Sequence, residues 1–573
     1  MGLIGFALTA GLAAATGMAV AAYAGTGGLG AFLVAVLQAM AAVWTAGVVL
    51  HRLTPGTILA LHAAFTSLAL LSTMLLGRGP ARRQAGAAGP PAGEVRAPRP
   101  AWFWLLLAVA AGETLWTVAR AVVFPPYAWD GLTYHLPAAA LWVQQGYIGQ
   151  LDWNQIWVNV YPENVELLLA WCFVFVRGQT LVQLVQLPFG LAGAVATAAL
   201  GRQAGLGRDA AAFAGLAFYL APIVLAQSGV PYVDLAYAAL FLIAVFFALK
   251  GRPLWAGTAL GLLAGVKTSG VGYAAVTILL ATALAPRGQR RRTLIAMAVP
   301  LGLLGSFWYL RTWVHYGNPI YPILVPHLFA GQGSLAELVE IINTPTAFRG
   351  HPLYALFAAW FEHANVWNYD VRVAGFGPLW PVAALPALPY FLAHRRQPAW
   401  RLFLYLAAAF IIQPMRWWTR YAIALFPLGA VALGSVLESD DRWLRRTVLA
   451  ISLGLVLVGS ALGTVRQPGL GPRKFLAALH EPRQFRMTRL GVYYGPEYRW
   501  LEDVDPGGVR IAAVQVYFTY VLLGEGLQNR LTPTVSDAQY LMAPDTWAAL
   551  SGWRVFARSP GWRVFVRDGG SEP

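Results

Sequence analysis

The sequence predicts an all-α polytopic membrane protein with a small external α/β domain at its C-terminus. The chain has 573 residues, of which 58% are hydrophobic and 12% are charged, about half the charged share of a soluble domain. Its apolar runs are many and near 20 residues long, the length that spans a bilayer. From residue 466 onward, polar sequence with short alternating segments replaces these runs.

The net charge of +16 indicates membrane topology rather than nucleic-acid binding. Most arginines lie in short loops between apolar runs, where an excess of basic residues marks the cytoplasmic side. The single cysteine, Cys172, excludes an internal disulfide and any metal site built from several cysteines. The positive charge therefore does not indicate nucleic acid as a partner.

Residues 1–100 are expected to form three N-terminal transmembrane helices and a linker. The three apolar runs lie at Leu3–Ala22, Ala31–Leu50 and Thr57–Leu76. The linker that follows is rich in glycine and proline, and five arginines place it in the cytoplasm. These arginines are Arg78, Arg82, Arg83, Arg96 and Arg99.

Residues 101–465 are expected to form the membrane core, with external loops 123–180 and 315–377. The first core span, Trp102–Val122, crosses outward. In the loop after it, Pro162–Val176 has about 15 residues, too few for a span, and we interpret it as a helix in the outer interface. Two short pieces, Leu254–Val266 and Gly270–Leu284, have basic residues at both outer ends, which favours a broken or re-entrant pair. The other spans, which bring the total to about 12, are Leu181–Leu200, Ala210–Ala226, Val233–Leu249, Thr293–Val314, Leu379–Ala393, Leu402–Ile412, Tyr421–Leu437 and Thr447–Val465.

Residues 466–573 are expected to form the external α/β domain. The sequence of Val509–Tyr517 predicts a strand. The segments Gly552–Phe556 and Gly561–Phe565 repeat nine residues apart and alternate apolar with polar side chains. This pattern, with a proline-containing turn between the segments, predicts a β-hairpin.

The polar run 129–137, with the sequence WDGLTYHLP, follows the first core span at the predicted outer surface. Ionisable groups there are costly unless they are used, so the run is a candidate functional site. Asp130 can act as a general base or simply cap the next helix. Trp129 and Tyr134 can stack on a sugar ring or belong to an interfacial aromatic belt. His135 can orient a phosphate, or it is an ordinary hydrogen-bonded interfacial histidine.

Two further acids and one lysine are candidates. Asp234 lies on the same predicted face as Asp130 and could share its site, or it could cap the helix it precedes. Glu163 could bind substrate, although glutamates in a first helical turn are ordinary partners of the helix dipole. Lys267 lies between the two short apolar pieces in a chain with only three lysines. It could hold a lipid-linked phosphate or snorkel to the interface.

Three arginines near predicted outer helix ends complete the set of candidates: Arg311, Arg416 and Arg420. Their forked donors suit phosphate oxygens, and the alternative is anchoring at the interface beside tryptophans. The sequence contains no P-loop, dinucleotide fingerprint, nucleophile elbow or His-Glu metalloprotease motif.

The run 129–137, followed by Trp142 and Gln145, resembles the first external loop of bacterial membrane glycosyltransferases of the GT-C fold. These are relatives of protein O-mannosyltransferases and of the lipid A aminoarabinose transferase. Three segments match in order: 231–234 resembles their second acidic motif, 261–268 their glycine-rich segment ending in lysine and threonine, and Pro162–Val176 their interfacial helix. The aminoarabinose transferases carry a basic residue beside the proline of that helix, where this chain has Tyr161 and Glu163.

The resemblance implies an inverting glycosyltransferase that moves a sugar from a polyprenyl-phosphate carrier to a lipid, glycan or protein acceptor. Asp130 is then the general base, and Asp234 helps to place acceptor or donor. Lys267, with Arg416 or Arg420, neutralises the leaving phosphate. The implied location is the bacterial inner membrane, with the site and the C-terminal domain on the periplasmic side. No cofactor is expected to be required, although this fold class is compatible with a divalent metal.

Two alternatives belong to other classes of protein. A transporter or flippase of lipid-linked sugars should show pseudo-symmetric halves with helices broken at matching places. The sequence has one such break and no repeat of the 129–137 run, which favours the enzyme. The other alternative is an inactive relative that serves as a membrane scaffold.

Overall fold

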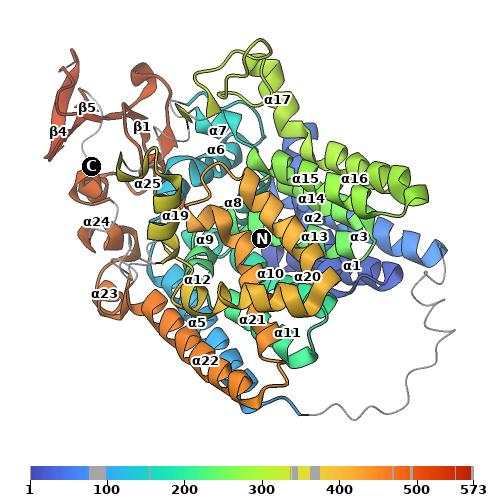
Figure 1. Ribbon diagram of the computed structural model, residues 1–573. Helices are drawn as coiled ribbons and strands as arrows, with labels where there is room; N and C mark the ends of the chain where they lie inside the picture. Colours follow the sequence, from blue (N-terminus) through green and yellow to red (C-terminus); the bar gives the residue numbers. More distant parts are fainter. Residues whose placement is uncertain are drawn as a thin grey trace.

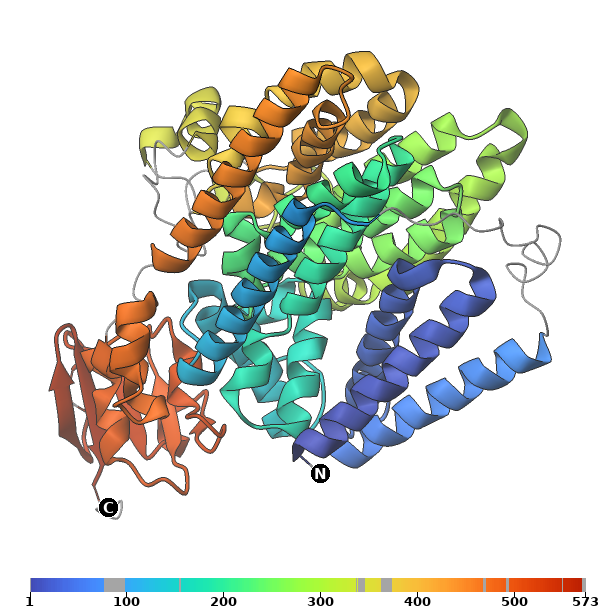
Figure 2. The same ribbon diagram turned by 90° about the horizontal axis from the view of Figure 1, so that it is seen from below.

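The structure is a computed structural model that describes residues 2–76, 98–153, 156–335, 337–338, 346–361, 374–466, 470–490, 494–548 and 550–568. Helices make up most of it, and a small sheet lies near the C-terminus (Figure 1). The helices pack into one bundle, and the sheet domain lies at one end of it (Figure 2). The predicted fold class is therefore confirmed.

The three N-terminal helices lie at the side of the bundle (Figure 2). They are α1 (Gly2–Ala24), α2 (Gly27–Trp44) and α3 (Pro55–Leu75), close to the predicted ranges. Thr54 caps α3 by accepting the backbone N–H of Thr57 at 3.3 Å, and a proline in the first turn suits a helix start. Trp171 of α8 donates its indole N–H to Thr9 of α1 at 3.1 Å, so a polar contact joins this group to the core.

The core consists of helices that differ widely in length. Helix α13 lies in its centre, and nearly every residue of α13 is buried. The core helices are α5 (Ala101–Val123), α6 (Leu136–Gln145), α7 (Trp157–Val160), α8 (Asn164–Phe175), α9 (Gln179–Gln183), α10 (Leu187–Gln203), α11 (Arg208–Tyr219), α12 (Pro222–Ser228), α13 (Asp234–Leu249), α14 (Pro253–Ala264), α15 (Ser269–Leu284), α16 (Arg290–Gly305), α17 (Phe307–Tyr316), α19 (Pro352–Trp360), α20 (Ala387–Ile412), α21 (Phe426–Val436) and α22 (Arg442–Val465).

The expected count of about 12 spans is not confirmed. Among the described residues, seven helices are long and apolar enough to cross a membrane, or up to nine if two bent pairs each count as one span. Five shorter apolar helices of 10–17 residues accompany them. The predicted span Ala210–Ala226 is one of the bent pairs, with a 60° bend before Pro222, and Thr293–Val314 is the other, with a 54° bend at Ser306. A proline and a Gly-Ser pair account for the two bends.

The predicted break near Lys267 is present. Helix α14 ends at Ala264, and α15 begins at Ser269. Gly265 allows the close packing here, because a Cβ atom on it would lie 2.1 Å from the side-chain nitrogen of Asn164. Likewise, a Cβ atom on Gly261 would lie 2.7 Å from the carbonyl oxygen of Pro300, so α14 and α16 are in backbone contact.

Arginines gather at one end of the bundle, where α11, α16 and α22 begin at Arg208, Arg290 and Arg442. Two ion pairs lie there, Arg99 with Asp209 and Arg395 with Glu438, the second at 2.6 Å. Helix α10 starts at the other end, where the side chain of Gln186 accepts the first N–H groups of α13. We call the first the arginine-rich end and the second the Asp234 end.

The C-terminal domain contains a five-stranded sheet in the order β2-β1-β3-β5-β4. Its strands are β1 (Arg510–Ala513), β2 (Arg530–Leu531), β3 (Tyr540–Pro544), β4 (Trp553–Ser559) and β5 (Trp562–Arg567). The predicted hairpin is β4–β5, an antiparallel pair with a bulge between Val555 and Ala557. Its two-residue turn needs a glycine because Gly561 has a φ of +80°. The predicted strand 509–517 is shorter, since only Arg510–Ala513 pairs with neighbours.

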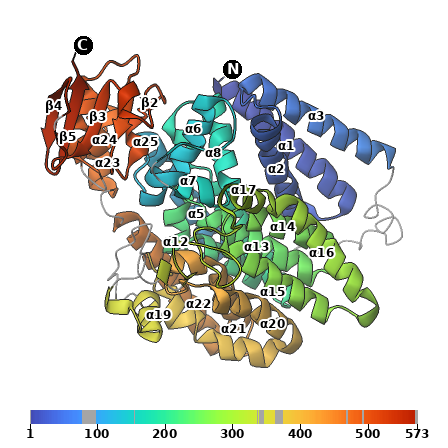
Figure 3. The ribbon, with the colours of Figure 1, turned by 90° about the horizontal axis from the view of Figure 1, so that it is seen from above.

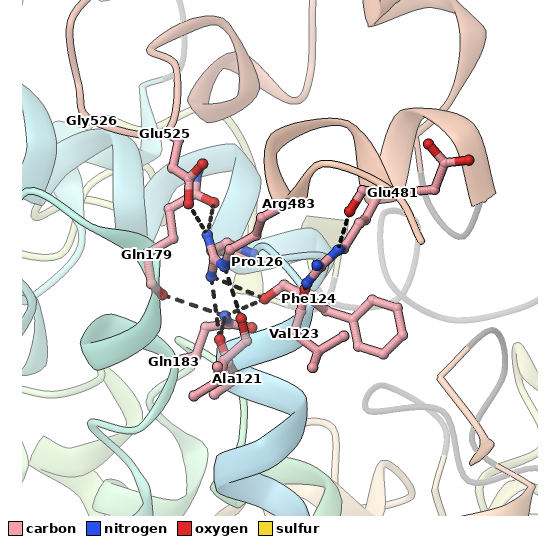
Figure 4. A network of polar contacts seen from close by, with 12 residues as sticks. Ala121, Val123, Phe124, Pro126, Gln179, Gln183, Glu481, Arg483, Glu525 and Gly526 are labelled. Atoms are coloured by element: carbon pink, nitrogen blue, oxygen red, sulfur yellow. Dashed lines mark hydrogen bonds and ion pairs between the residues drawn. The ribbon is translucent and has the colours of Figure 1, made fainter. Parts of the chain in front are cut away.

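Two arginines, Arg483 and Arg486, fasten this domain to the core, and Arg486 donates to the carbonyl oxygen of Val123. Arg483 donates to the carbonyl oxygens of Ala121 and Phe124, at 3.2 Å each, and to the side chains of Gln179 and Glu525, at 3.0 and 2.6 Å (Figure 4). The carbonyls at the C-terminus of α5 have no partner within the helix, and Arg483 shares their satisfaction with the side-chain amide of Gln183. The domain lies beside α6 and α8 (Figure 3).

Candidate active site

Asp130 faces a cation from a distant part of the chain. Its carboxylate accepts a hydrogen bond from Arg420 at 2.7 Å. The backbone N–H of Asp130 donates to the hydroxyl of Tyr232 at 3.1 Å. Gly131 lets these segments meet, since a Cβ atom there would lie 2.8 Å from the Pro231 ring. The Asp130 side chain makes no capping hydrogen bond to the π-helical turn Gly131–His135, so the capping alternative does not describe it.

Asp234 lies deeper, at the start of α13. Its side chain is 3% exposed and pairs with Lys267 through one oxygen, and Arg420 lies 3.7 Å from the other. Gln186 takes the capping role at this helix start, with its side-chain oxygen 2.8 Å from the N–H of Leu235. The carboxylate of Asp234 is therefore committed to the two cations rather than to the helix. Lys267 points inward to this pair, not outward to the interface.

Two tyrosines complete the cluster. Arg420 donates to the hydroxyl of Tyr421 at 2.6 Å, and the Lys267 amine lies 4.1 Å from the centre of the same ring. The Arg420 guanidinium also lies 5.2 Å from the ring centre of Tyr232. Such rings attract cations that are shielded from water. The sequence reasoning did not single out either tyrosine, although each belongs to a segment with a predicted site residue.

A cavity of about 590 Å³ opens beside these charges. This volume is typical of a small-molecule site. The C-terminal domain contributes to it through Tyr517, whose neighbour Phe518 packs edge-on against Trp129 with ring centres 4.7 Å apart. The polar and aromatic side chains of its wall are Trp129, Asp130, Thr133, Tyr134, Trp157, Tyr161, Thr268, Tyr321, Trp418, Arg420, Tyr421 and Tyr517.

The electrostatics of the cavity keep Asp130 ionised. Burial by itself raises the pKa of this carboxyl, but the charge of Arg420, assisted by His135 and Lys267, outweighs burial and lowers the pKa below its usual value. Burial and the negative charge of Asp130 raise the pKa of Tyr161 on the cavity wall. Asp130 can therefore accept a proton, whereas the Tyr161 hydroxyl beside it stays protonated.

A second buried charge cluster lies behind the cavity. His135 pairs with Glu166, and Arg311 pairs with Glu163 at 2.6 Å. Arg311 also donates to the carbonyl oxygens of Asn159 and Tyr161, at 2.8 and 3.1 Å. Burial, opposed by Arg311, raises the pKa of Glu163 to about 8. These contacts hold residues 159–166 in place, so Glu163, Arg311 and His135 support the cavity rather than line it.

The predicted site residues thus divide into three groups. Asp130, Arg420, Asp234 and Lys267 form one continuous series of ion pairs in that order. Trp129 and Tyr134 line the cavity, and Glu163, Arg311 and His135 lie behind it. The structure does not bring Arg416 to the cavity; its guanidinium donates to the carbonyl oxygen of Ile411 at 2.6 Å. In the part of the chain described here, no three histidine, cysteine or acidic side chains gather into a metal-binding group.

Comparison with known proteins gives a fold-level match. No protein-family model and no curated protein sequence matches the chain. ArnT from Cupriavidus metallidurans, solved with bound undecaprenyl phosphate, is 13% identical over 82% of this chain and 98% of its own, with a TM-score of 0.51. The oligosaccharyltransferase AglB from Archaeoglobus fulgidus, solved with an inhibitory peptide and a dolichol-phosphate, is 16% identical over 76% of this chain and 65% of its own, with a TM-score of 0.42. The similarity to ArnT shows that the chain has the GT-C fold.

Proposed function

We propose that this chain is an inverting glycosyltransferase that moves a sugar from a polyprenyl-phosphate carrier to an acceptor, with Asp130 as general base. One observation carries the proposal: the Asp130 side chain lies on the wall of the cavity, hydrogen-bonded to Arg420. It occurs on the fold of ArnT, whose solved structure holds undecaprenyl phosphate.

In the proposed step, the acceptor hydroxyl or amine transfers its proton to the Asp130 carboxylate. The freed electron pair attacks the anomeric carbon of the donor sugar and forms the new glycosidic bond. The bond from that carbon to the phosphate oxygen breaks, and its electrons leave with polyprenyl phosphate. Attack from the face opposite the phosphate inverts the anomeric configuration, and the low pKa of Asp130 keeps the base ionised at neutral pH.

The leaving phosphate gains negative charge as the bond breaks. Arg420 and Lys267 are the cations of this cluster, and both are already held in place by carboxylates and by the Tyr421 ring. Donors fixed before the reaction stabilise developing charge without the cost of reorientation. In this proposal Asp234 keeps Lys267 and Arg420 in position, and the aromatic wall, including Trp129 and Tyr134, packs on the sugar.

We infer the membrane side from the distribution of basic residues between the two bundle ends. The proposed catalytic cluster lies at the Asp234 end, whereas α11, α16 and α22 begin with arginines at the other end. Because basic loops stay in the cytoplasm, the cavity opens on the external face, which is the periplasmic side in a bacterial inner membrane. The donor is then lipid-borne rather than a cytosolic nucleotide sugar.

The proposed reaction requires no metal. A divalent ion would balance the charge of an acid pair, but here Asp130 and Asp234 already face Arg420 and Lys267. We expect that treatment with a metal chelator leaves the transfer rate unchanged. Loss of transfer that added magnesium or manganese restores would contradict this part of the proposal.

The test uses purified full-length protein, a polyprenyl-phosphate sugar and a panel of lipid, glycan and peptide acceptors. Replacing Asp130 by asparagine keeps the oxygen that Arg420 contacts and removes the base, so transfer should fall by at least about 100-fold. Donor binding, measured separately, should persist. The control is Asp209→Asn, which removes an acid at the arginine-rich end and should leave transfer unchanged.

Two outcomes would overturn the assignment. Equal transfer by the wild type and Asp130→Asn would remove Asp130 from the reaction. Movement of the donor across vesicle membranes by wild-type protein, with no transfer to any acceptor, would indicate a transporter instead.

A further inference from the structure

We propose a second binding site, for the headgroup of an anionic phospholipid, at the arginine-rich end of the bundle. A cavity of about 640 Å³ lies there, between the C-terminal ends of α13 and α15, the start of α14 and the start of α16. Helix α20 closes it with Arg401 and Tyr405. This volume would accommodate a phosphate-bearing headgroup and its glycerol, with the acyl chains outside.

This cavity is separate from the candidate active site. Helix α13 begins at Asp234, in the catalytic cluster, and its last residues, Ala248 and Leu249, line the second cavity. At 1.5 Å per residue, its 16 residues separate the two sites by about 20 Å. A ligand here cannot touch Asp130 or Lys267, so the proposal does not depend on the transferase reaction.

All charged side chains that line this cavity are positive. The lining contains three arginines, Arg252, Arg292 and Arg401, and no acidic side chain. Arg252 donates to the carbonyl oxygen of Ala24 at 2.9 Å, which fixes its position beside α1. Within the described residues, Arg292 and Arg401 have no carboxylate at ion-pair distance. Three arginines from three segments therefore line one cavity with spare donors, and their forked groups suit phosphate oxygens.

Most of the other lining residues are apolar, and Gln289, Thr293 and Tyr405 are the polar ones among them. Leu254 and Leu284, which are 57% and 42% exposed, continue from the cavity to the outer surface of the helices. A free anion would leave these surfaces unused, whereas a phospholipid covers them with acyl chain while its phosphate meets the arginines. Basic pockets between transmembrane helices bind anionic headgroups in this way.

The experiment measures lipid binding by native mass spectrometry on the full-length protein. Cardiolipin, phosphatidylglycerol and phosphatidylcholine are each titrated into detergent-purified protein. The wild type should bind the two anionic lipids more tightly than phosphatidylcholine. The double variant Arg292→Gln/Arg401→Gln should bind them about tenfold or more weakly, because it loses charge-assisted hydrogen bonds.

The matched control is Arg287→Gln/Arg291→Gln. It removes two exposed arginines from the same region that do not line the cavity, and it should retain wild-type binding. Equal weakening in the two double variants would mean that general surface charge attracts the lipid, and the site would be rejected. Wild-type binding of phosphatidylcholine as tight as that of cardiolipin would reject it as well.

Discussion

Four charged side chains alternate in sign across the candidate active site: Asp130, Arg420, Asp234 and Lys267. Each carboxylate touches a cation, and Arg420 lies between the two acids. Burial of single charges is costly, and a partner at contact distance offsets that cost. The four charges therefore stabilise one another, and the loss of one member leaves a buried neighbour without its contact partner; Asp234, for example, would keep only Arg420 at 3.7 Å if Lys267 were removed.

A single and a double variant can distinguish a structural role of Lys267 from a catalytic one. Lys267→Met should lower the free energy of unfolding by about 3–5 kcal/mol, because Asp234 loses the cation bonded to it. The double variant Lys267→Met/Asp234→Asn removes both charges and should recover most of that loss in a thermal-unfolding assay. Transfer should stay low in the double variant, since the cation for the leaving phosphate is absent. Full recovery of transfer together with stability would assign Lys267 a purely structural role.

Glu163 makes stability depend on pH. Burial raises its pKa in the folded protein from 4.5 to about 8. The unfolded chain therefore releases this proton first as the pH rises, and the stabilising contribution present below pH 4.5 is lost between about pH 4.5 and pH 8. The thermal-unfolding midpoint should fall over this window, and it should fall less in Glu163→Gln. The control Glu481→Gln, at a partly exposed ion pair with Arg489, should keep the wild-type slope; a wild-type slope in Glu163→Gln would contradict the prediction.

At the residue scale, much of the charged cluster could be predicted from unusual placement of charge. Asp130, Asp234, Lys267 and Arg420 were predicted because each interrupts or borders an apolar segment. Arg416 was predicted on the same grounds, and the structure leaves it outside the cavity. The chain between α20 and the helical turn Thr419–Leu425 is irregular. Arg416 and Arg420 are four residues apart, but without a regular helix between them they do not lie on the same face. Contacts such as that of Lys267 with Tyr421 join distant segments, and no local pattern reveals them.

At the scale of elements, hydropathy predicted most helix positions but could not give the number of spans. Long apolar runs such as Gly2–Ala24 and Arg442–Val465 are helices of spanning length. Asp234–Leu249 and Ser269–Leu284 are apolar but shorter, and bends such as the one at Ser306 divide others. Whether a short helix crosses the membrane depends on its packing against neighbouring helices, and the hydropathy of the sequence does not predict this packing.

The break between α14 and α15 should depend on the absence of a side chain at Gly265. A methyl group there would collide with Asn164, which donates to the carbonyl oxygen of Leu262 and accepts the indole N–H of Trp308 at 2.8 Å. Gly265→Ala should therefore cost about 1–3 kcal/mol through these buried hydrogen bonds and also lower transfer, because Lys267 lies two residues away. Gly302→Ala in α16 is the control, since nothing lies near its Cβ position, and it should be neutral or stabilising. Equal unfolding midpoints in the two variants would contradict this account.

At the scale of the whole molecule, the C-terminal domain completes the cavity. The β4–β5 hairpin could be predicted from alternation within a short segment. The placement of Tyr517 on the cavity wall and of Phe518 against Trp129 could not, because both depend on docking of the domain. Gln144 of α6 adds hydrogen bonds to the carbonyl oxygens of Leu527 and Asn529, at 3.1 and 2.7 Å. Docking of the domain therefore fixes one side of the space that an acceptor would enter.

Arg483 is the residue whose loss should loosen that docking. Arg483→Ala removes the contacts to the end of α5 and to Glu525 (Figure 4). Gln183 also donates to the carbonyl oxygens of Ala121 and Phe124, so these acceptors stay partly satisfied and the expected cost is about 1.5–3 kcal/mol. Limited proteolysis should then release the domain faster than in wild-type protein. The KM for acceptor should rise while donor binding stays unchanged, because Tyr517 lines the cavity and Lys267 belongs to the core.

Arg489→Ala is the matched control for this change. Arg489 pairs with Glu481 and Glu502 inside the C-terminal domain, and its side chain is 37% exposed. Exposed pairs of this kind contribute about 0–1 kcal/mol, so proteolysis and the acceptor KM should match the wild type. If Arg483→Ala weakened donor binding as much as acceptor binding, the domain would act on the whole cavity through Trp129. If neither binding nor proteolysis changed, the contacts of Gln144 and Phe518 would suffice to hold the domain, and Arg483 would only satisfy the end of α5.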